Sequence, residues 1–187
     1  MRRVAKIGVL ACSALAVVAP VVASGGDATA SRSKPCPKPA VRVAKSAGSV
    51  ELSCDGELRA SFAATFGASP KGPKERRGDE KTPEGDYRVT SRAPSDRFHR
   101  FVGISYPNAD DLRRAKEKGI RDPGDGIGLH GVDARLAGPA RAWTRFAHAT
   151  GLHRLWGPTD GCVGMTNEDV EALYDAVRVG TRVVILP

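Results

Sequence analysis

Apolar residues occupy every second position in several short segments of the chain, a pattern typical of β-strands that bury one face. Asp55-Gly56 supplies a hairpin turn between two of these segments. The predicted strands are residues 41–44, 50–52, 61–66, 87–90, 127–129 and 182–186.

Helices are fewer than strands. Asn108 is a good N-cap for a helix over residues 109–118, which Gly119 would end. A second helix should begin at Thr166 or Asn167 and run to about residue 177, and a third is expected near residues 140–149. These elements predict a mainly β fold with a few peripheral helices.

The amino terminus has the order of a secretory signal peptide. Three basic residues among the first six precede an apolar stretch, residues 7–22, which ends in small side chains. We expect residues 1–23 to be the signal peptide, with cleavage after Ala23. The alternatives are cleavage after Ala30 or retention as an uncleaved anchor.

Residues 24–40 are rich in Ser, Gly, Thr, Lys and Pro, a composition that predicts a linker. One folded domain should then span residues 41–187, a length sufficient for a single core. Within it, residues 71–81 are charged and carry no periodicity, so we expect them to form an exposed loop.

The formal net charge of +8 indicates a moderately basic protein. In an exported, extracytoplasmic protein, such a surface suits an anionic cell wall and peptide carboxylates. The basic stripe with interleaved aromatic residues that would stack on bases is missing from the sequence, which argues against nucleic acid. We expect a monomer in the cell envelope or secreted.

Cysteine usage is informative, because export would place Cys36, Cys54 and Cys162 in an oxidising compartment. Their number is odd. We expect a disulfide between Cys36 and Cys54 that ties the amino-terminal arm to the domain and leaves Cys162 free. The alternative for Cys162 is a buried thiol that acts as a small hydrophobic side chain.

Cys162 directly follows Gly161 and precedes a predicted helix, two features that favour a reactive thiol. Glycine lets a substrate carbonyl approach the backbone. Nearby amides and the helix start should lower the thiol pKa below its usual value of about 8.5. The amides of Gly161 and Cys162 would form an oxyanion hole.

A thiol nucleophile needs a base, and His130 is the best candidate because it ends a predicted strand beside Gly131. His99, His148 and His153 are its rivals. His153 belongs to a glycine-bearing segment that predicts a loop, and rigid elements hold side chains better than loops do. We therefore predict that His130 is the base and that His153 contacts the substrate.

Four motifs in this order resemble the YkuD-type L,D-transpeptidases, and their wording is closest to the YafK-like branch of that family. The resemblance covers about residues 41–187 and implies a YkuD-like β-sandwich. The motifs are Gly78 to Tyr87 (GDEKTPEGDY), Ile104 to Asn108 (ISYPN), Leu129-His130-Gly131, and Thr159-Asp160-Gly161-Cys162 followed by Asn167-Glu168-Asp169.

The resemblance implies an exported cysteine enzyme that crosslinks or remodels peptidoglycan and so contributes to cell shape. Cys162 would attack a stem-peptide carbonyl while His130 takes its proton. The acyl group would pass to an amine or, in the alternative reading as an L,D-peptidase, to water. The resemblance implies neither cofactor nor metal. We predict that the substrate-binding site is lined by Gly131, His153, Arg154, Thr159 and Asp160.

The sequence around Cys162 differs from the family pattern at two positions. Many members read Ser-His-Gly-Cys with an Arg two residues after the Cys, whereas here Asp160 precedes Gly161 and Gly164 takes the place of that Arg. A fixed bidentate partner for a substrate carboxylate or carbonyl is thereby lost. Arg154 is the candidate replacement, and simple surface solvation is its alternative role.

Two other classes of protein compete with this interpretation. A zinc hydrolase would use His130, His153 and Cys162 as ligands, but the short paired-ligand motifs of zinc sites do not include them. A non-catalytic wall-binding module would have little reason to keep Cys162 and His130 together. Inactivation by thiol alkylation, rather than by chelators, would distinguish the cysteine enzyme.

Overall fold

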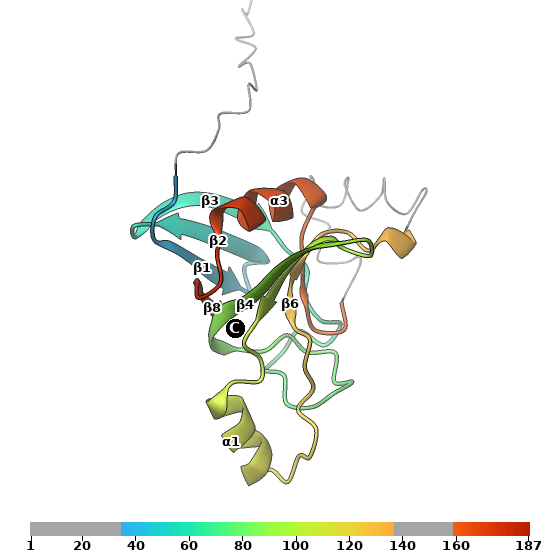
Figure 1. The fold of residues 1–187 in the computed structure, drawn as a ribbon. Helices are drawn as coiled ribbons and strands as arrows, with labels where there is room; N and C mark the ends of the chain where they lie inside the picture. The colour runs from blue at the N-terminus through green and yellow to red at the C-terminus, as the bar shows by residue number, and fades with distance from the viewer. Residues whose placement is uncertain (1–34, 137–158) are drawn as a thin grey trace, which may run out of the picture. The chain divides into compact units, whose positions relative to one another are not determined.

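The computed structural model describes residues 35–136 and 159–187, whose framework is a curled sheet of eight strands (Figure 1). Across the sheet the order is β3-β2-β1-β8-β4-β5-β6-β7. The strands are β1 (Pro39–Ala44), β2 (Ser49–Cys54), β3 (Glu57–Ala63), β4 (Gly85–Ser95), β5 (His99–Ile104), β6 (Gly128–His130), β7 (Val163–Gly164) and β8 (Arg182–Leu186).

The first three strands form an antiparallel meander, and β1 also pairs in parallel with β8. Asp55 and Gly56, with φ of 54° and 87°, make the tight turn between β2 and β3 that their sequence predicts. Alternate residues of β1 and β2, among them Val43 and Val50, are fully buried in the core.

Strand β4 joins the two halves of the sheet. Its first residues, Gly85 to Arg88, pair with β8, whereas Val89 to Ser95 pair with β5. A register irregularity between Val89 and Ser91 marks the change of partner. The sheet curls along this strand, and the prediction of a mainly β, YkuD-like fold is confirmed.

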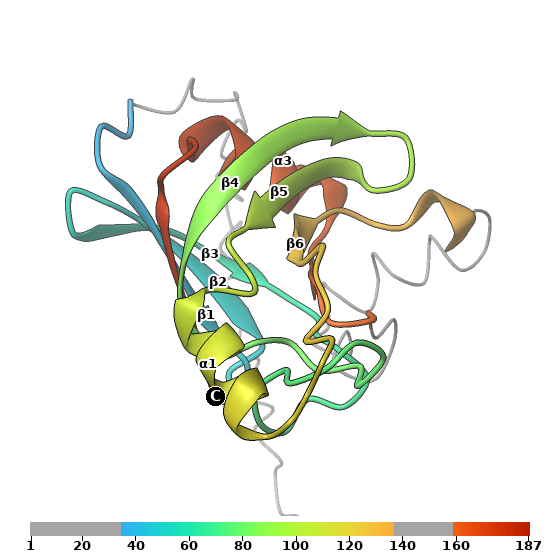
Figure 2. The same ribbon diagram turned by 60° about the horizontal axis from the view of Figure 1, so that its bottom comes forward.

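Both α-helices that the structure describes begin where the sequence predicts, and a short 3₁₀ helix spans Ala134–Leu136. Helix α1 (Ala109–Glu117) carries a capping box from Asn108, and α3 (Asn167–Ala176) is capped by the Thr166 hydroxyl. They lie at opposite ends of the sheet, and α3 packs against β5 and β6 (Figures 1 and 2). The helix expected over residues 140–149 and the signal peptide of residues 1–23 lie outside the described residues.

The two edges of the sheet approach each other through the segment that follows β3. Thr65 bridges to Gly164 with two backbone hydrogen bonds of 2.9 Å, and Gly67 bridges to Thr159. These contacts bring the residues after β3 alongside β7, next to Cys162.

The loop over residues 71–81 is less exposed than its charge predicts. Lys74 is only 5% exposed, and its ammonium lies 2.8 Å from a carboxylate oxygen of Asp79. Lys45, also buried, pairs with Glu84 at 2.7 Å. The expectation of an exposed loop is therefore wrong at Lys74, because its carboxylate partner allows the ammonium to leave water.

Cys36 and Cys54 are joined by a disulfide with an S–S distance of 2.00 Å, which ties the residues before β1 to the end of β2. Cys162 is the free cysteine among the described residues. Within the same residues, each helix is too short or too polar to cross a membrane.

Candidate active site

The imidazole is carried by the last residue of β6, and the thiol by the residue just before β7, which pairs with β6 in parallel. In the register of β6 with β7, His130 is opposite Gly164, two residues beyond Cys162. The sulfur of Cys162 lies 3.6 Å from the carbonyl oxygen of Gly126. The backbone N–H of Gly128, at the start of β6, also bonds to this sulfur. Cys162 is therefore held against the strand that ends in His130.

Burial raises the pKa of the Cys162 thiol, although the Gly128 N–H and the charges of Lys74 and Arg97 oppose the change. The sequence-based expectation of a lowered pKa is wrong. Helix α3 begins only at Asn167, beyond β7, so its positive end is not at the sulfur. This environment therefore favours the thiol over the thiolate.

His130, which the sequence predicts to be the base, is the last residue of β6. Its side chain is buried, and Nδ1 lies 2.7 Å from the carbonyl oxygen of Gly131. A carbonyl oxygen only accepts, so Nδ1 carries the proton and Nε2 has the free lone pair. Burial also lowers the pKa of His130, which keeps the ring neutral.

Two aromatic side chains hold the imidazole in place. The Phe98 ring centroid lies 4.0 Å from that of His130, and the Phe101 centroid lies 6.2 Å away in a nearly parallel orientation. Phe98 also accepts a 3.0 Å hydrogen bond from the Gly131 amide through its carbonyl oxygen. Our sequence reasoning missed both residues, because β5 and the turn before it were not predicted.

Gly131 is required by this close packing. A Cβ at this position would lie 2.5 Å from the Asn167 side-chain oxygen and 2.8 Å from the carbonyl oxygen of Phe98. The same Asn167 oxygen accepts a hydrogen bond from the amide of Val132. Asn167, the first residue of α3, thus holds the chain just after His130.

Thr159 organises the turn that carries the thiol. Its hydroxyl donates to the Cys162 carbonyl at 2.6 Å and accepts from the Gly161 amide at 3.1 Å. Gly161 has φ of +131°, and a Cβ there would lie 2.6 Å from the Lys81 carbonyl oxygen. The Gly161 amide is thus engaged by Thr159, and the oxyanion hole of Gly161 and Cys162 stays a prediction.

The remaining predicted site residues are Asp160, the alternative bases and Arg154. Asp160 is exposed, and its charge raises the pKa of Cys162. Of the alternative bases, His99 faces Glu171 at 3.1 Å, an ion-pair distance without the alignment of a hydrogen bond. His148, His153 and Arg154 lie outside the described residues.

Within residues 35–136 and 159–187, the side chains of His, Cys, Asp and Glu form no group of three or more that could hold a metal ion. Of the three ligands that the zinc alternative requires, only His130 and Cys162 belong to these residues.

The register of β6 with β7 places His130 and Cys162 on paired segments of the chain, as the predicted thiol–imidazole pair requires. The sequence profile described as the YkuD L,D-transpeptidase catalytic domain matches residues 38–185. The chain belongs to this family. Comparison with curated protein sequences gives no match.

Solved structures of this kind share the fold at low sequence identity. The helical cell shape determining protein Pgp2 from Campylobacter jejuni has a TM-score of 0.55 and 20% identity, over 79% of this chain and 47% of that one. Bd1075 from Bdellovibrio bacteriovorus has a TM-score of 0.54 and 21% identity, over 80% and 48%.

An L,D-transpeptidase from Mycobacterium smegmatis has a TM-score of 0.50 and 15% identity, over 80% of this chain and 59% of that one. The chain therefore corresponds to about half to three fifths of the length of these neighbours.

Proposed function

We propose that this protein is an exported cysteine L,D-transpeptidase that remodels peptidoglycan through an acyl-enzyme on Cys162. The observation that carries the proposal is the pairing of β6 with β7, which brings the Cys162 segment alongside the strand of His130, whose Nδ1 proton is committed to the Gly131 carbonyl. Membership of the L,D-transpeptidase family supports peptidoglycan stem peptides as the substrate class.

Acylation begins when Nε2 of His130 removes the Cys162 proton as the sulfur attacks the stem-peptide carbonyl. A bond forms between sulfur and the carbonyl carbon. The carbon–nitrogen bond then breaks, and the imidazolium returns the proton to the leaving amine. The product is a thioester on Cys162 and a released D-amino acid.

Transfer reverses these roles. An acceptor amine gives its proton to His130 as it attacks the thioester, and the sulfur leaves as the thiol once the proton returns. The result is a new peptide bond, which crosslinks the wall. Water in place of the amine would give a carboxylate, the outcome for an L,D-peptidase of the same fold.

Export is part of the proposal. The Cys36–Cys54 disulfide suits an oxidising compartment outside the cytoplasm. The basic composition suits an anionic wall. The cell-shape role named for the Campylobacter neighbour makes wall remodelling a reasonable function for this chain as well.

Incubation of the purified mature protein with tetrapeptide muropeptides, followed by mass spectrometry, tests the proposal. We expect crosslinked dimers when an amine acceptor is present, and tripeptides if water is the acceptor. A carbapenem should add one acyl mass to the intact protein. The Cys162→Ala variant should give none of these products.

Thermal unfolding of Cys162→Ala provides the control, because a variant that has kept the fold should melt close to the parent. Turnover above a trace in this folded variant would exclude the thiol mechanism. A parent protein that converts no muropeptide would exclude the proposed function.

A further inference from the structure

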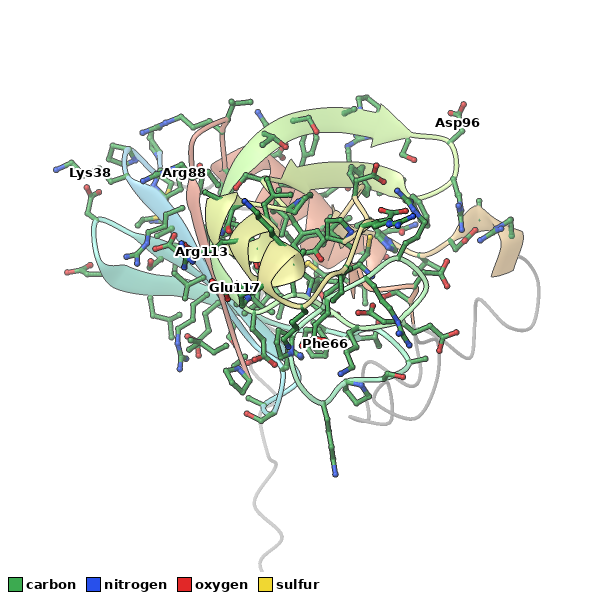
Figure 3. The ribbon with its side chains drawn as sticks, turned by 90° about the horizontal axis from the view of Figure 1, so that it is seen from below. Lys38, Phe66, Arg88, Asp96, Arg113 and Glu117 are labelled. Carbon is green, nitrogen blue, oxygen red and sulfur yellow. A yellow bond between two sulfur atoms is a disulfide. The ribbon has the colours of Figure 1, made fainter. Side chains whose placement is uncertain are left out.

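We propose that Arg97 binds a carboxylate of the donor stem peptide beside His130, and so supplies the guanidinium that many family members carry where this chain has Gly164. The inference rests on the proposed function and goes beyond it by naming the residue that recognises the substrate's charge. Arg97 lies in the turn between β4 and β5, whose tip is marked by Asp96 in Figure 3.

Phe98 connects Arg97 to the catalytic pair. The guanidinium carbon of Arg97 lies 4.4 Å from the centroid of the Phe98 ring, and the same ring lies 4.0 Å from the ring of His130. The positive charge of Arg97 also lowers the pKa of both His130 and Cys162. An anion bound to Arg97 would therefore lie next to the reacting groups.

The hydrogen-bonding capacity of Arg97 is only partly used. Its Nε donates to a carboxylate oxygen of Asp133 at 3.0 Å. Within the part of the chain that the structure describes, its two terminal nitrogens make no hydrogen bond, and the side chain is 46% exposed. A planar guanidinium with free terminal nitrogens can receive both oxygens of a carboxylate.

The local charge balance also favours an anion. Asp133 is shared by two guanidinium groups, because Arg135 donates to both of its carboxylate oxygens at 3.0 Å. Two positive charges thus face one negative charge. A second carboxylate, supplied by the substrate, would complete the pairing.

Backbone contacts hold the turn in position before any substrate arrives. The Ala134 amide donates to the Arg97 carbonyl at 2.6 Å, and the Gly131 amide donates to the Phe98 carbonyl at 3.0 Å. Phe98 in turn donates through its own amide to the Ser95 hydroxyl. A preorganised side chain loses less freedom when it binds, which makes its contact more favourable.

Lys74, the other cation that acts on the thiol, is a poor alternative. Its side chain is 4% exposed, and its ammonium donates to Asp79 and to the Arg76 carbonyl oxygen. A substrate would have to displace the loop to reach it. Arg97 is open to solvent and can meet the substrate directly.

The carboxylate in question is the terminal group of the D-residue that leaves. In a donor cut between an L-centred carbonyl and a terminal D-residue, this carboxylate is only one residue from the bond that breaks. Recognition by Arg97 would select donors with a free terminus and would reject those whose terminus is amidated.

The test compares a stem tetrapeptide with a free terminal carboxylate against the same peptide with a terminal amide. Binding is measured by calorimetry in a Cys162→Ala background, so that turnover does not interfere. A charged hydrogen bond at a partly exposed site predicts a preference of about tenfold for the carboxylate. Arg97→Gln should remove this preference, so that the two peptides bind with equal affinity.

Arg113→Gln is the matched control, because it removes one exposed guanidinium from α1, away from the hairpin tip (Figure 3). It should keep the tenfold preference. A preference that survives in Arg97→Gln, or one that disappears equally in Arg113→Gln, would overturn the assignment of Arg97.

Turnover of the two peptides by the protein with Cys162 intact separates this inference from the proposed function. Conversion of the carboxylate peptide, with a preference that Arg97→Gln abolishes through KM, supports both. Conversion with an unchanged preference in Arg97→Gln overturns only the role of Arg97. If neither peptide is converted or bound, both proposals fail.

Discussion

The hydroxyl oxygen of Thr65 lies 2.5 Å from the point that a Cβ on Gly164 would occupy. Thr65 therefore occupies the space that a side chain at position 164 would need. Thr65 and Gly164 face each other in an isolated bridge, so a larger residue at one position requires a change at the other.

Restoring a side chain at Gly164 should destabilise the protein, because the site is already filled. Gly164→Ala is expected to lower the free energy of unfolding by about 1–3 kcal/mol, the usual cost of overpacking. Chemical denaturation measures it. In a Thr65→Ala background the nearest Thr65 atom would be the Cβ, 3.9 Å away, so the same substitution should cost much less. Equal costs in both backgrounds would contradict this account.

The two histidines that the sequence assigns to the site should differ in their kinetic effects. We predict that His130→Ala lowers kcat by about 10²-fold or more, the usual size of a lost general base. His153→Ala should mainly raise KM, as expected for a substrate contact. Steady-state kinetics on a muropeptide separate the two, and exchanged signatures would show that the base is wrongly assigned.

The pH dependence should report the environment of His130. Burial lowers its pKa, while Asp133 opposes and Arg97 assists the change. Because only the neutral ring can take a proton, activity is lost as the pH falls through the pKa of the folded protein. The acid limb of kcat/KM should therefore lie below the usual histidine value of about 6.5.

Asp133→Asn provides a directional check on this limb. Removal of a negative charge that favours the protonated ring should move the acid limb to still lower pH. A limb above about 6.5 in the parent, or a shift to higher pH in the variant, would argue against a buried neutral imidazole.

Asp79 should stabilise the loop beside the thiol at neutral pH. Burial alone would raise its pKa, but backbone N–H groups of Glu75, Arg76 and Lys81 and the Lys74 ammonium outweigh burial and lower the pKa to about 2. A lowered carboxyl pKa stabilises the folded state above the unfolded value of about 4, and the contribution disappears as the pH falls towards 2.

Asp79→Asn is therefore expected to cost about 2 kcal/mol of unfolding free energy at pH 7. Urea denaturation at several pH values measures the cost. The difference between parent and variant should shrink between about pH 4 and pH 2. A difference that stays constant over this range would mean that the carboxylate charge contributes nothing.

The disulfide should contribute to stability without contributing to catalysis. Replacing Cys36 and Cys54 together by Ser opens a link with a sequence separation of 18. The chain-entropy model predicts a loss of about 3 kcal/mol. Denaturation measures the loss, and Cys162 should still react with a carbapenem. Non-reducing peptide mapping that found both thiols free in the parent would refute the pairing.

Much of the fold was accessible from local signals in the sequence. Alternation predicted β1 and β2, a continuous apolar run predicted β8, and the caps at Asn108 and Thr166 predicted the starts of both described α-helices. These signals are local, because a strand with one buried face and a capped helix can each be recognised from a few consecutive residues.

Features that depend on distant partners were missed. The segment that becomes β5 was not predicted, since His99 and Arg100 precede its apolar residues and His99 has a positive φ of 63° that no local pattern signals. Lys74 looked solvated because its carboxylate partner becomes evident only in the folded loop. The thiol pKa was misjudged because burial depends on the whole site.

Because β6 and β7 pair in parallel, the chain must return to the other end of the sheet between His130 and Cys162. The connection from Gly131 to Cys162 starts next to one reacting group and ends at the other. The sheet therefore sets how His130 and Cys162 lie relative to each other, and the connection between them can differ in sequence while this strand pairing is kept.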